Sequence, residues 1–296
     1  MASSTVVSVV PTQSVRWRFR AFFRDWKLVT GVAILLGLLL FGLVGPLVVS
    51  EEGTRLGAGE YSAPPSARHP LGTDSTGRDV LAMMVYGTRP TLRVGFLAGG
   101  IGILVGVILG LISGYYRGPV DTIIRSAADI TLTIPALAVL VVLASFLRTT
   151  TVELMAVIVA LFAWPWPTRT IRAQTLTLRE SGFVSMSRLS GRNDLEILFL
   201  EILPNLLPFI MASFVSAVSG AILASVGLQL LGLGPILTPT LGLILQYAFE
   251  YAAIVRGMWW WWGPPTVFLM LLFIGLFLIS MAMDEIANPR LKGAAE

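Results

Sequence analysis

The sequence predicts an all-α membrane protein whose chain crosses the bilayer six times. Hydrophobic residues make up 55% of its 296 residues, charged residues only 13%, and the mean hydropathy is +0.80. Soluble domains carry about a quarter charged residues. The apolar residues are grouped in long runs, and about 20 of them in a row suffice to cross a bilayer. We expect spans at about residues 28–49, 91–114, 132–147, 154–166, 207–231 and 263–283.

The chain begins with a segment, residues 1–27, that we expect outside the bilayer and in front of a transmembrane domain covering 28–296. Residues 16–27 alternate basic and aromatic side chains, which suits contact with anionic headgroups, but an ordinary basic flank of the first span is the simpler interpretation. The apolar run 28–49 is about twice the length of a signal-peptide core and lacks a small-residue cleavage site. The first span is therefore expected to be retained.

Residues 50–90 are polar and rich in turn formers, so we expect them outside the bilayer. Within them, Asp74 or Ser75 is expected to cap a helix start, with Arg78 and Asp79 in its first turn. His69 is expected to be a solvated loop residue. Residues 115–131 are expected to form a short polar connection. The third and fourth spans are short, which requires tilt or a locally thinner bilayer.

Two of the predicted spans carry small residues at four-residue spacing. The residues on these faces are Gly102, Gly106, Gly110 and Gly114 in the second span and Ala212, Ser216, Gly220 and Ala224 in the fifth. A smooth face lets a neighbouring helix approach closely, and it can also line a transport path. Both interpretations stay open, and helix packing is the one we favour for the glycines.

Residues 232–262 are expected outside the membrane core. Within them, 238–262 is apolar but interrupted by Gln246, Glu250 and Arg256, which indicates a helix lying on the membrane or dipping into it. Glu250 and Arg256 are six residues apart and need not pair. We interpret the tryptophans at 259–262 as an interfacial anchor rather than a stacking site for sugars.

A polar island, residues 168–206, separates the fourth and fifth spans. Its core reads GFVSMSRLSGRNDLEILFLEILPNLLP, which predicts a short helix over 183–190, a break at Gly191 and a second helix opening at Asn193 or Asp194. Glycine ends helices by adopting the left-handed conformation, and Asn and Asp cap the helix that follows. The island is expected to be a bent, rigid knob on which another protein pushes.

Charge asymmetry orients the chain. Six spans place both termini on one side, together with the basic N-terminal segment, Arg117, Arg125 and the five arginines of the island. The richer side in cations is cytoplasmic, so the island is expected to face the cytoplasm. The same rule explains the net charge of +4, which therefore does not indicate nucleic-acid binding.

Composition also excludes several kinds of site. The chain has no cysteine and one histidine, His69, so neither a thiolate nor a histidine metal cluster is possible within it. The polar segments are too short to build a catalytic domain. The spans are nearly free of ionisable groups, which argues against an intramembrane enzyme.

The island resembles the EAA motif of ABC-importer permeases, in which E-A-A is followed by three residues, a glycine and an apolar stretch ending in I-x-L-P. Ser185-Met186-Ser187 stand where E-A-A belongs, Gly191 is in register, and residues 202–205 read ILPN. The segment HPLGTDSTGRDVLAMMVYG (69–87) is similar to a segment of the second permease subunit of dipeptide and oligopeptide importers. LGLGP (231–235), NPRL (288–291) and RFRAFFRDWKLVTG (18–31) also match.

The resemblance implies a membrane subunit of an ATP-driven importer of oligopeptides or dipeptides in the inner membrane. Its expected partners are a homologous permease in a heterodimer, two cytoplasmic ABC ATPases, an extracytoplasmic substrate-binding protein and the lipid bilayer. The chain is expected to be no enzyme and to bind no cofactor, with ATP and Mg held by the ATPases. The implied ATPase contacts are Ser185, Met186, Ser187, Arg188, Gly191, Arg192, Asn193 and Asp194. Asp74, Arg78 and Asp79 are candidates for contact with the binding protein.

Two departures from the family pattern change details. Ser185 replaces the family's glutamate, so an ion pair with the ATPase is lost, and Arg188 and Arg192 suggest an acidic cleft on the partner. Alternatively, Ser185 and Ser187 only cap or solvate their helix. Residues 239–242 read PTLG where the family has Pro-Ser-Trp-Gly. Oligosaccharides or nickel chelates are the alternative cargo, and an export or scaffold subunit without coupling is the remaining rival.

Overall fold

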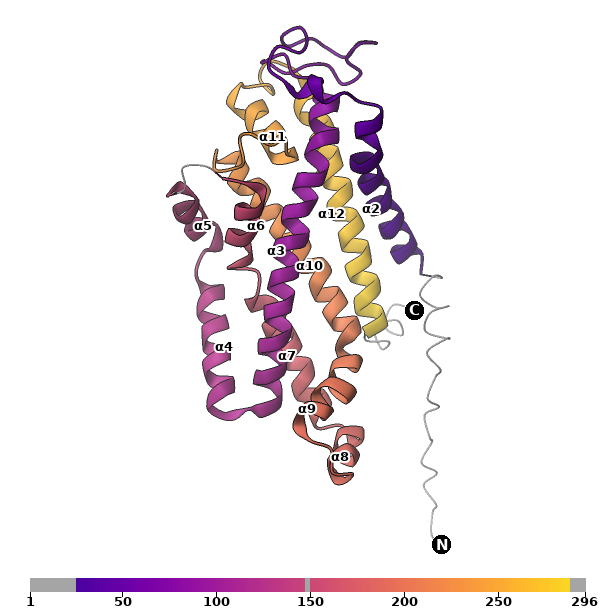
Figure 1. Ribbon diagram of the computed structural model, residues 1–296, viewed down its shortest axis with the longest axis vertical. Helices are drawn as coiled ribbons and strands as arrows, with labels where there is room; N and C mark the ends of the chain where they lie inside the picture. The colour runs from indigo at the N-terminus through magenta and orange to yellow at the C-terminus, as the bar shows by residue number, and fades with distance from the viewer. Residues whose placement is uncertain (1–24, 147–149, 288–296) are drawn as a thin grey trace.

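The computed structural model describes residues 25–146 and 150–287, and within them four long helices form a bundle (Figure 1). Each of the four is long and apolar enough to cross a membrane. They are α2 (Trp26–Val44), α3 (Val80–Tyr116), α10 (Leu203–Leu230) and α12 (Trp259–Ala287). At one end of the bundle lie α8 (Gly182–Leu189) and α9 (Asp194–Glu196), and at the other lie the loop 45–79 and α11 (Leu241–Glu250). We refer to these as the α8 end and the α11 end.

Two bent helix pairs complete the bundle. The axes of α4 (Gly118–Thr133) and α5 (Ala136–Ser145) meet at 78°, and those of α6 (Val152–Ala160) and α7 (Pro165–Arg179) at 46°. Counting each pair as one span gives six among the described residues, as predicted. The chain is thus an all-α polytopic membrane protein.

The boundaries predicted for this part of the chain were wrong. Residues 115–131 are no polar connection, because most of them belong to α4, and the predicted span 132–147 straddles the bend at Pro135. The residue before a proline is pushed out of the helical region, and Ile134 has an extended ψ of 130°. The first part of the predicted polar island is likewise helical, since α7 runs to Arg179.

Helix α3 begins at Val80, eleven residues before the predicted start of the second span, and Pro90 lies inside it. Prolines are more frequent in membrane helices than in soluble ones. Beside Pro90, the Thr88 and Thr91 hydroxyls donate to the carbonyls of Met84 (2.7 Å) and Gly87 (2.8 Å). With 37 residues, α3 is about 55 Å long, against a hydrocarbon core of about 30 Å. It therefore reaches from one end of the bundle to the other.

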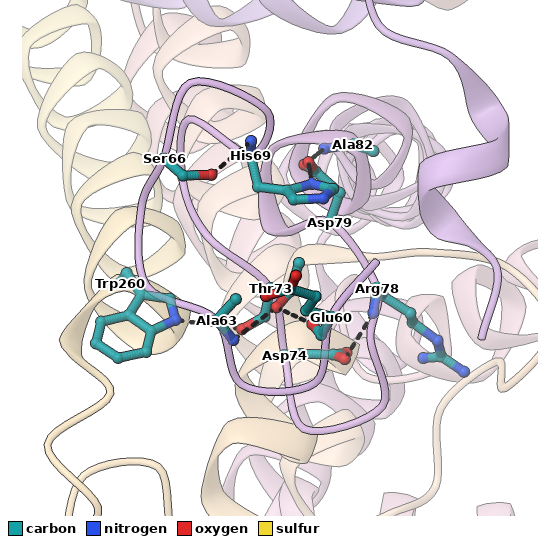
Figure 2. Close-up of polar contacts among 10 residues, drawn as sticks. All are labelled: Glu60, Ala63, Ser66, His69, Thr73, Asp74, Arg78, Asp79, Ala82 and Trp260. Atoms are coloured by element: carbon teal, nitrogen blue, oxygen red, sulfur yellow. Dashed lines mark hydrogen bonds and ion pairs between the residues drawn. The ribbon is translucent and has the colours of Figure 1, made fainter. Parts of the chain in front are cut away.

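The loop before α3 is held by buried polar side chains (Figure 2). Asp79, rather than Asp74 or Ser75, caps α3 by accepting from Ala82 N at 2.9 Å. Its other oxygen lies 2.6 Å from His69 Nδ1, so His69 is not the solvated residue that we expected. Trp260 Nε1 donates to the carbonyl of Thr73 at 3.2 Å and ties the loop to α12.

Helix α11 packs one of its faces into the core of the bundle. Its N-cap, Thr240, accepts from Leu243 N at 3.1 Å and its hydroxyl binds Gln229 of α10. Leu241 is fully buried, and its N–H donates to Thr91 of α3 at 3.0 Å. The tryptophan run serves two purposes, since Trp261 is 1% exposed in the core whereas Trp259 is 59% exposed. An interfacial anchor therefore describes only part of this run.

Some predictions fall outside the described residues. They concern the segment 1–24 and the NPRL tail at 288–291. Next to the first of these, α2 begins at Trp26 with Asp25 as its N-cap. Lys27 contacts Glu285 near the end of α12, so the start of α2 and the end of α12 lie together.

Candidate functional site

The knob at the α8 end has the backbone that the sequence predicted. Helix α8 ends before Gly191, whose φ of +82° lies in the left-handed region that favours glycine. Asn193 then opens α9 through a capping box: its side chain accepts from Glu196 N at 2.8 Å, and Glu196 accepts from Asn193 N at 3.3 Å. Two short helices are thereby fixed at an angle, and they protrude beyond the rest of the bundle (Figure 1).

Tyr115, in the last turn of α3, connects this knob to the longest helix. Its hydroxyl donates to Asp194 Oδ1 at 2.7 Å. The guanidinium carbons of Arg179 and Arg188 each lie 5.6 Å from the centre of the Tyr115 ring, within the range of cation–π attraction. One aromatic side chain thus contacts α7, α8 and α9 at once.

Glu201 forms a second connection between the knob and the bundle. It lies in η3 (Ile197–Ile202), a π-helical turn that leads into α10. Its Oε1 accepts from the Ser187 hydroxyl at 3.0 Å and contacts the Arg192 guanidinium. Single π-helical turns are rare in proteins, and those that occur often lie at functional sites. Helix α8 is therefore joined to the segment leading into α10 by a side chain as well as by the backbone.

These contacts change how the predicted surface residues are understood. Arg188 faces Tyr115 and Arg192 faces Glu201, so each cation has a partner within this chain. Ser185 donates back to the carbonyl of Ser181 at 3.3 Å within its own helix, whereas Ser187 donates to Glu201 at 3.0 Å outside it. The acidic cleft on a partner stays a prediction. Arg188 and Arg192 each already have one contact within this chain.

An exposed apolar patch covers the outer face of the knob. Met186, Leu189 and Leu195 are 66%, 84% and 61% exposed, and Phe183 of the same face is 39% exposed. The apolar residues 183, 186 and 189 are three apart, so they share one face of α8. Only Met186 was among the predicted site residues. Helical spacing is the signal that could have identified Phe183 and Leu189, because a contiguous exposed apolar patch marks a protein contact.

Below the knob, ion pairs fasten α4 to α7. Arg172 Nε and Nη2 lie 2.5 Å and 2.6 Å from the two oxygens of Asp121, a bidentate pair with both side chains less than 20% exposed. Such fork-to-fork pairs are the strong ones. Arg117 Nη2 also lies 2.7 Å from Glu180 Oε1. The base of the knob is therefore held by one largely buried and one exposed ion pair.

The two stripes of small residues have different surroundings. A Cβ added to Gly102, Gly106 or Gly110 would come within 2.5–2.9 Å of Ala163, Pro167 or Ile171, so these glycines let the segment leading into α7 and α7 itself pack on α3. Ser216, Gly220 and Ala224 instead line a hollow of about 350 Å³ beside α5 to α7, and nothing lies within 4 Å of an added Cβ at Gly220. Ala212 is buried next to α2 and α12.

Asp74, Arg78 and Asp79 lie at the opposite end of the molecule from the knob. Asp74 is 3% exposed, and its Oδ1 accepts from Thr76 N, Thr76 Oγ1 and Arg78 N at 2.7–2.9 Å. Arg78 stacks over the ring of Tyr247 at 5.1 Å. The carboxylates of Asp74 and Asp79 thus already bind groups in or next to the loop. Within residues 25–146 and 150–287, no group of three or more His, Cys, Asp or Glu side chains is placed to hold a metal ion.

Comparison with known proteins identifies the family to which this arrangement belongs. Residues 106–293 match the model of the binding-protein-dependent transport system inner membrane component. The chain belongs to this family. The permease is also 32% identical to the oligopeptide transport system permease protein OppC of Lactococcus lactis subsp. cremoris, over 78% of this chain and 79% of the relative.

Other relatives have similar names. The permease is 31% identical to the dipeptide transport system permease protein DppC of Haemophilus influenzae, over 83% of this chain and 85% of the relative. It is 32% identical to the glutathione transport system permease protein GsiD of Pectobacterium atrosepticum, over 79% of each. Its fold is similar to a chain of the inward-facing MetNI methionine ABC transporter, with a TM-score of 0.55, 21% identity and coverage of 70% and 95% of the two chains.

Proposed function

We propose that this permease is a membrane subunit of an ATP-driven importer of short peptides, and that α8 is its contact with the ATPases. The carrying observation is the knob itself: an exposed apolar patch on a helix that Tyr115 and Glu201 tie to the two longest apolar helices of the described chain. The relatives named for oligopeptides, dipeptides and glutathione support a peptide cargo over oligosaccharides or nickel chelates.

The proposed assembly contains a homologous permease, two cytoplasmic ATPases that hold ATP and Mg, and an extracytoplasmic binding protein. This chain binds no cofactor in the proposal. We place the α8 end and both termini in the cytoplasm. The contact between Lys27 and Glu285 supports a common side for the termini, and the arginines around α8 follow the positive-inside rule.

In the proposed mechanism, closure of the ATPases moves α8 as a rigid body. The hydrogen bond from Tyr115 to Asp194 passes this motion to α3, and Glu201 passes it to α10. Because α3 runs the length of the bundle, its far end moves the loop 45–79 at the same time. The permease then alternates between outward-open and inward-open states without chemistry of its own.

The test places a charge in the apolar patch. Leu189→Glu is expected to weaken retention of the ATPases on the purified complex at least tenfold, because burying an unpaired carboxylate in an interface is costly. Uptake of trialanine into proteoliposomes that contain the complete complex is expected to fall to the same extent. Leu56→Glu is the matched control, since Leu56 is 68% exposed in the loop at the other end. Neither change is expected to alter the thermal stability of the permease.

The two parts of the proposal fail separately. Full ATPase retention and transport in the Leu189→Glu complex would mean that the ATPases dock elsewhere. A wild-type complex that retains its ATPases but does not take up trialanine would instead reject the peptide cargo and leave α8 as the docking element.

A further inference from the structure

The α11 half of the bundle contains a cavity that the proposed coupling mechanism does not use. Its volume is about 1060 Å³, at the upper limit of the 300–1,000 Å³ common for ligand pockets. The walls come from α2, α3, α6 and residues 232–238, and most of them are apolar. Leu43, Phe96 and Ile236 are examples.

Three charged side chains line this cavity among the described residues: Arg89, Arg93 and Glu153. Arg93 Nη1 lies 3.0 Å from Glu153 Oε1, and this pair balances its own charge. Arg89 is one helical turn away on the same face of α3, and it forms no ion pair within residues 25–146 and 150–287. The described lining therefore carries one unbalanced positive charge.

The position of these charges along the helices is informative. A Cβ at Gly42 of α2 would touch Thr88 and Arg89, so Arg89 lies beside the last turns of an apolar spanning helix, and Arg93 lies one turn further inward. Charged side chains at membrane depth face the protein or a water-filled space, and they mark the paths of substrates. The charged side chains therefore favour water or protein, rather than lipid, as the surroundings of this cavity.

We propose that the cavity is a station on the transport path, at which Arg89 binds the free C-terminal carboxylate of the peptide. This inference rests on the proposed import of peptides. A guanidinium matches a carboxylate with two parallel hydrogen bonds, and the carboxylate is a group that all unmodified linear peptides share. The apolar walls can accommodate different peptide side chains without selecting among them. One unbalanced positive charge among apolar walls therefore suits a path that must pass peptides of differing sequence.

The first test measures transport by the complete complex in proteoliposomes. Arg89→Gln is expected to lower the uptake of trialanine about tenfold or more, the effect of losing a hydrogen-bonded charge pair. Arg89→Lys keeps the charge but not the bidentate geometry. Its uptake of trialanine is expected to lie between that of wild type and that of Arg89→Gln. Arg55→Gln, an exposed arginine outside the cavity, is the control and is expected to transport like wild type. Unchanged uptake in Arg89→Gln would overturn the proposal.

The second test measures occupancy of the cavity without relying on transport. The chain has no cysteine, so Ile236→Cys supplies a single thiol in the cavity wall, and Ile274→Cys supplies one on α12 away from it. In the assembled complex, a charged, membrane-impermeant thiol reagent is expected to label position 236 but not position 274. Trialanine is expected to slow this labelling, and trialanine amide to slow it much less. Adding Arg89→Gln is expected to abolish the protection by trialanine.

The outcomes separate this inference from the proposed function. If trialanine is transported but protects no better than its amide, Arg89 does not bind the carboxylate. If vesicles containing phosphatidylglycerol protect position 236 and trialanine does not, the cavity is a lipid site and the proposal is wrong. If the wild-type complex does not transport trialanine and trialanine does not protect the Ile236→Cys complex from labelling, the peptide cargo itself is rejected.

Discussion

The loop at the α11 end and the knob at the α8 end are both polar, but they use their polar side chains differently. In the loop, Asp74 and Asp79 are 3% and 8% exposed, and both accept hydrogen bonds from backbone N–H groups. In the knob, Arg192 is 44% exposed and pairs with a side chain. Buried, backbone-bound carboxylates fix a conformation, whereas exposed ion pairs contribute little to stability. The loop is therefore held rigidly by its buried side chains, whereas the knob keeps an exposed surface.

Both regions still depend on α3. Asp79 caps its first turn and Tyr115 lies in its last, so one helix of 37 residues carries both the loop and the knob. Fixing a loop at one end and tying a knob to the other allows a displacement of the knob to reach the far side of the membrane. Changes at either end of α3 can test this comparison.

The largest effect on stability is expected in the loop. Asp74→Ala removes a buried acceptor of three hydrogen bonds and leaves part-buried N–H groups unpaired, at a cost of about 3 kcal/mol in the free energy of unfolding. Thermal unfolding of the purified permease in detergent measures the effect. Glu51→Ala, an exposed acid of the same loop, is the control. Equal unfolding temperatures for both variants would contradict the view of a rigid loop.

A smaller cost in stability but a large loss of coupling is expected at Gly191. Nothing lies within 4 Å of an added Cβ there, so Gly191→Val causes no clash, but the left-handed backbone costs about 1–2 kcal/mol for a residue with a side chain. The angle between α8 and α9 is expected to change, and the ratio of peptide transported to ATP hydrolysed to fall. Gly191→Asn, which tolerates this conformation better, should retain most of the coupling. The same loss in both variants would mean that the backbone conformation is not the cause.

The smallest change in stability is expected at Tyr115. Tyr115→Phe keeps the ring between Arg179 and Arg188 but removes the hydrogen bond to Asp194, at a cost of about 1 kcal/mol. If this bond connects the knob to α3, transport per ATP hydrolysed falls while the ATPases stay bound. The double variant with Asp194→Asn should then be no worse than the single one. Additive losses would show that the two side chains act independently.

Local sequence patterns were sufficient for the knob and for the longest apolar spans. The fold class followed from hydropathy, since apolar runs such as 207–231 leave few alternatives to a membrane helix. The break at Gly191 and the cap at Asn193 were found because left-handed glycines and capping side chains act within a few residues. A helix start was expected at Asp74 or Ser75 and the second span only from residue 91, whereas one helix runs from Val80 through Pro90 to Tyr116.

Contacts between distant residues were decided by the tertiary structure alone. Tyr115 meets Asp194 across 79 positions, and Trp260 meets Thr73 across 187, and no local pattern indicates either pair. The charges of Arg188 and Arg192 were visible in the sequence, but their partners were not. Hydropathy and caps are properties of one segment, whereas the use of a polar side chain depends on what the fold brings next to it. The sequence thus determined that a knob exists, and the tertiary structure decided what holds it and which face it presents.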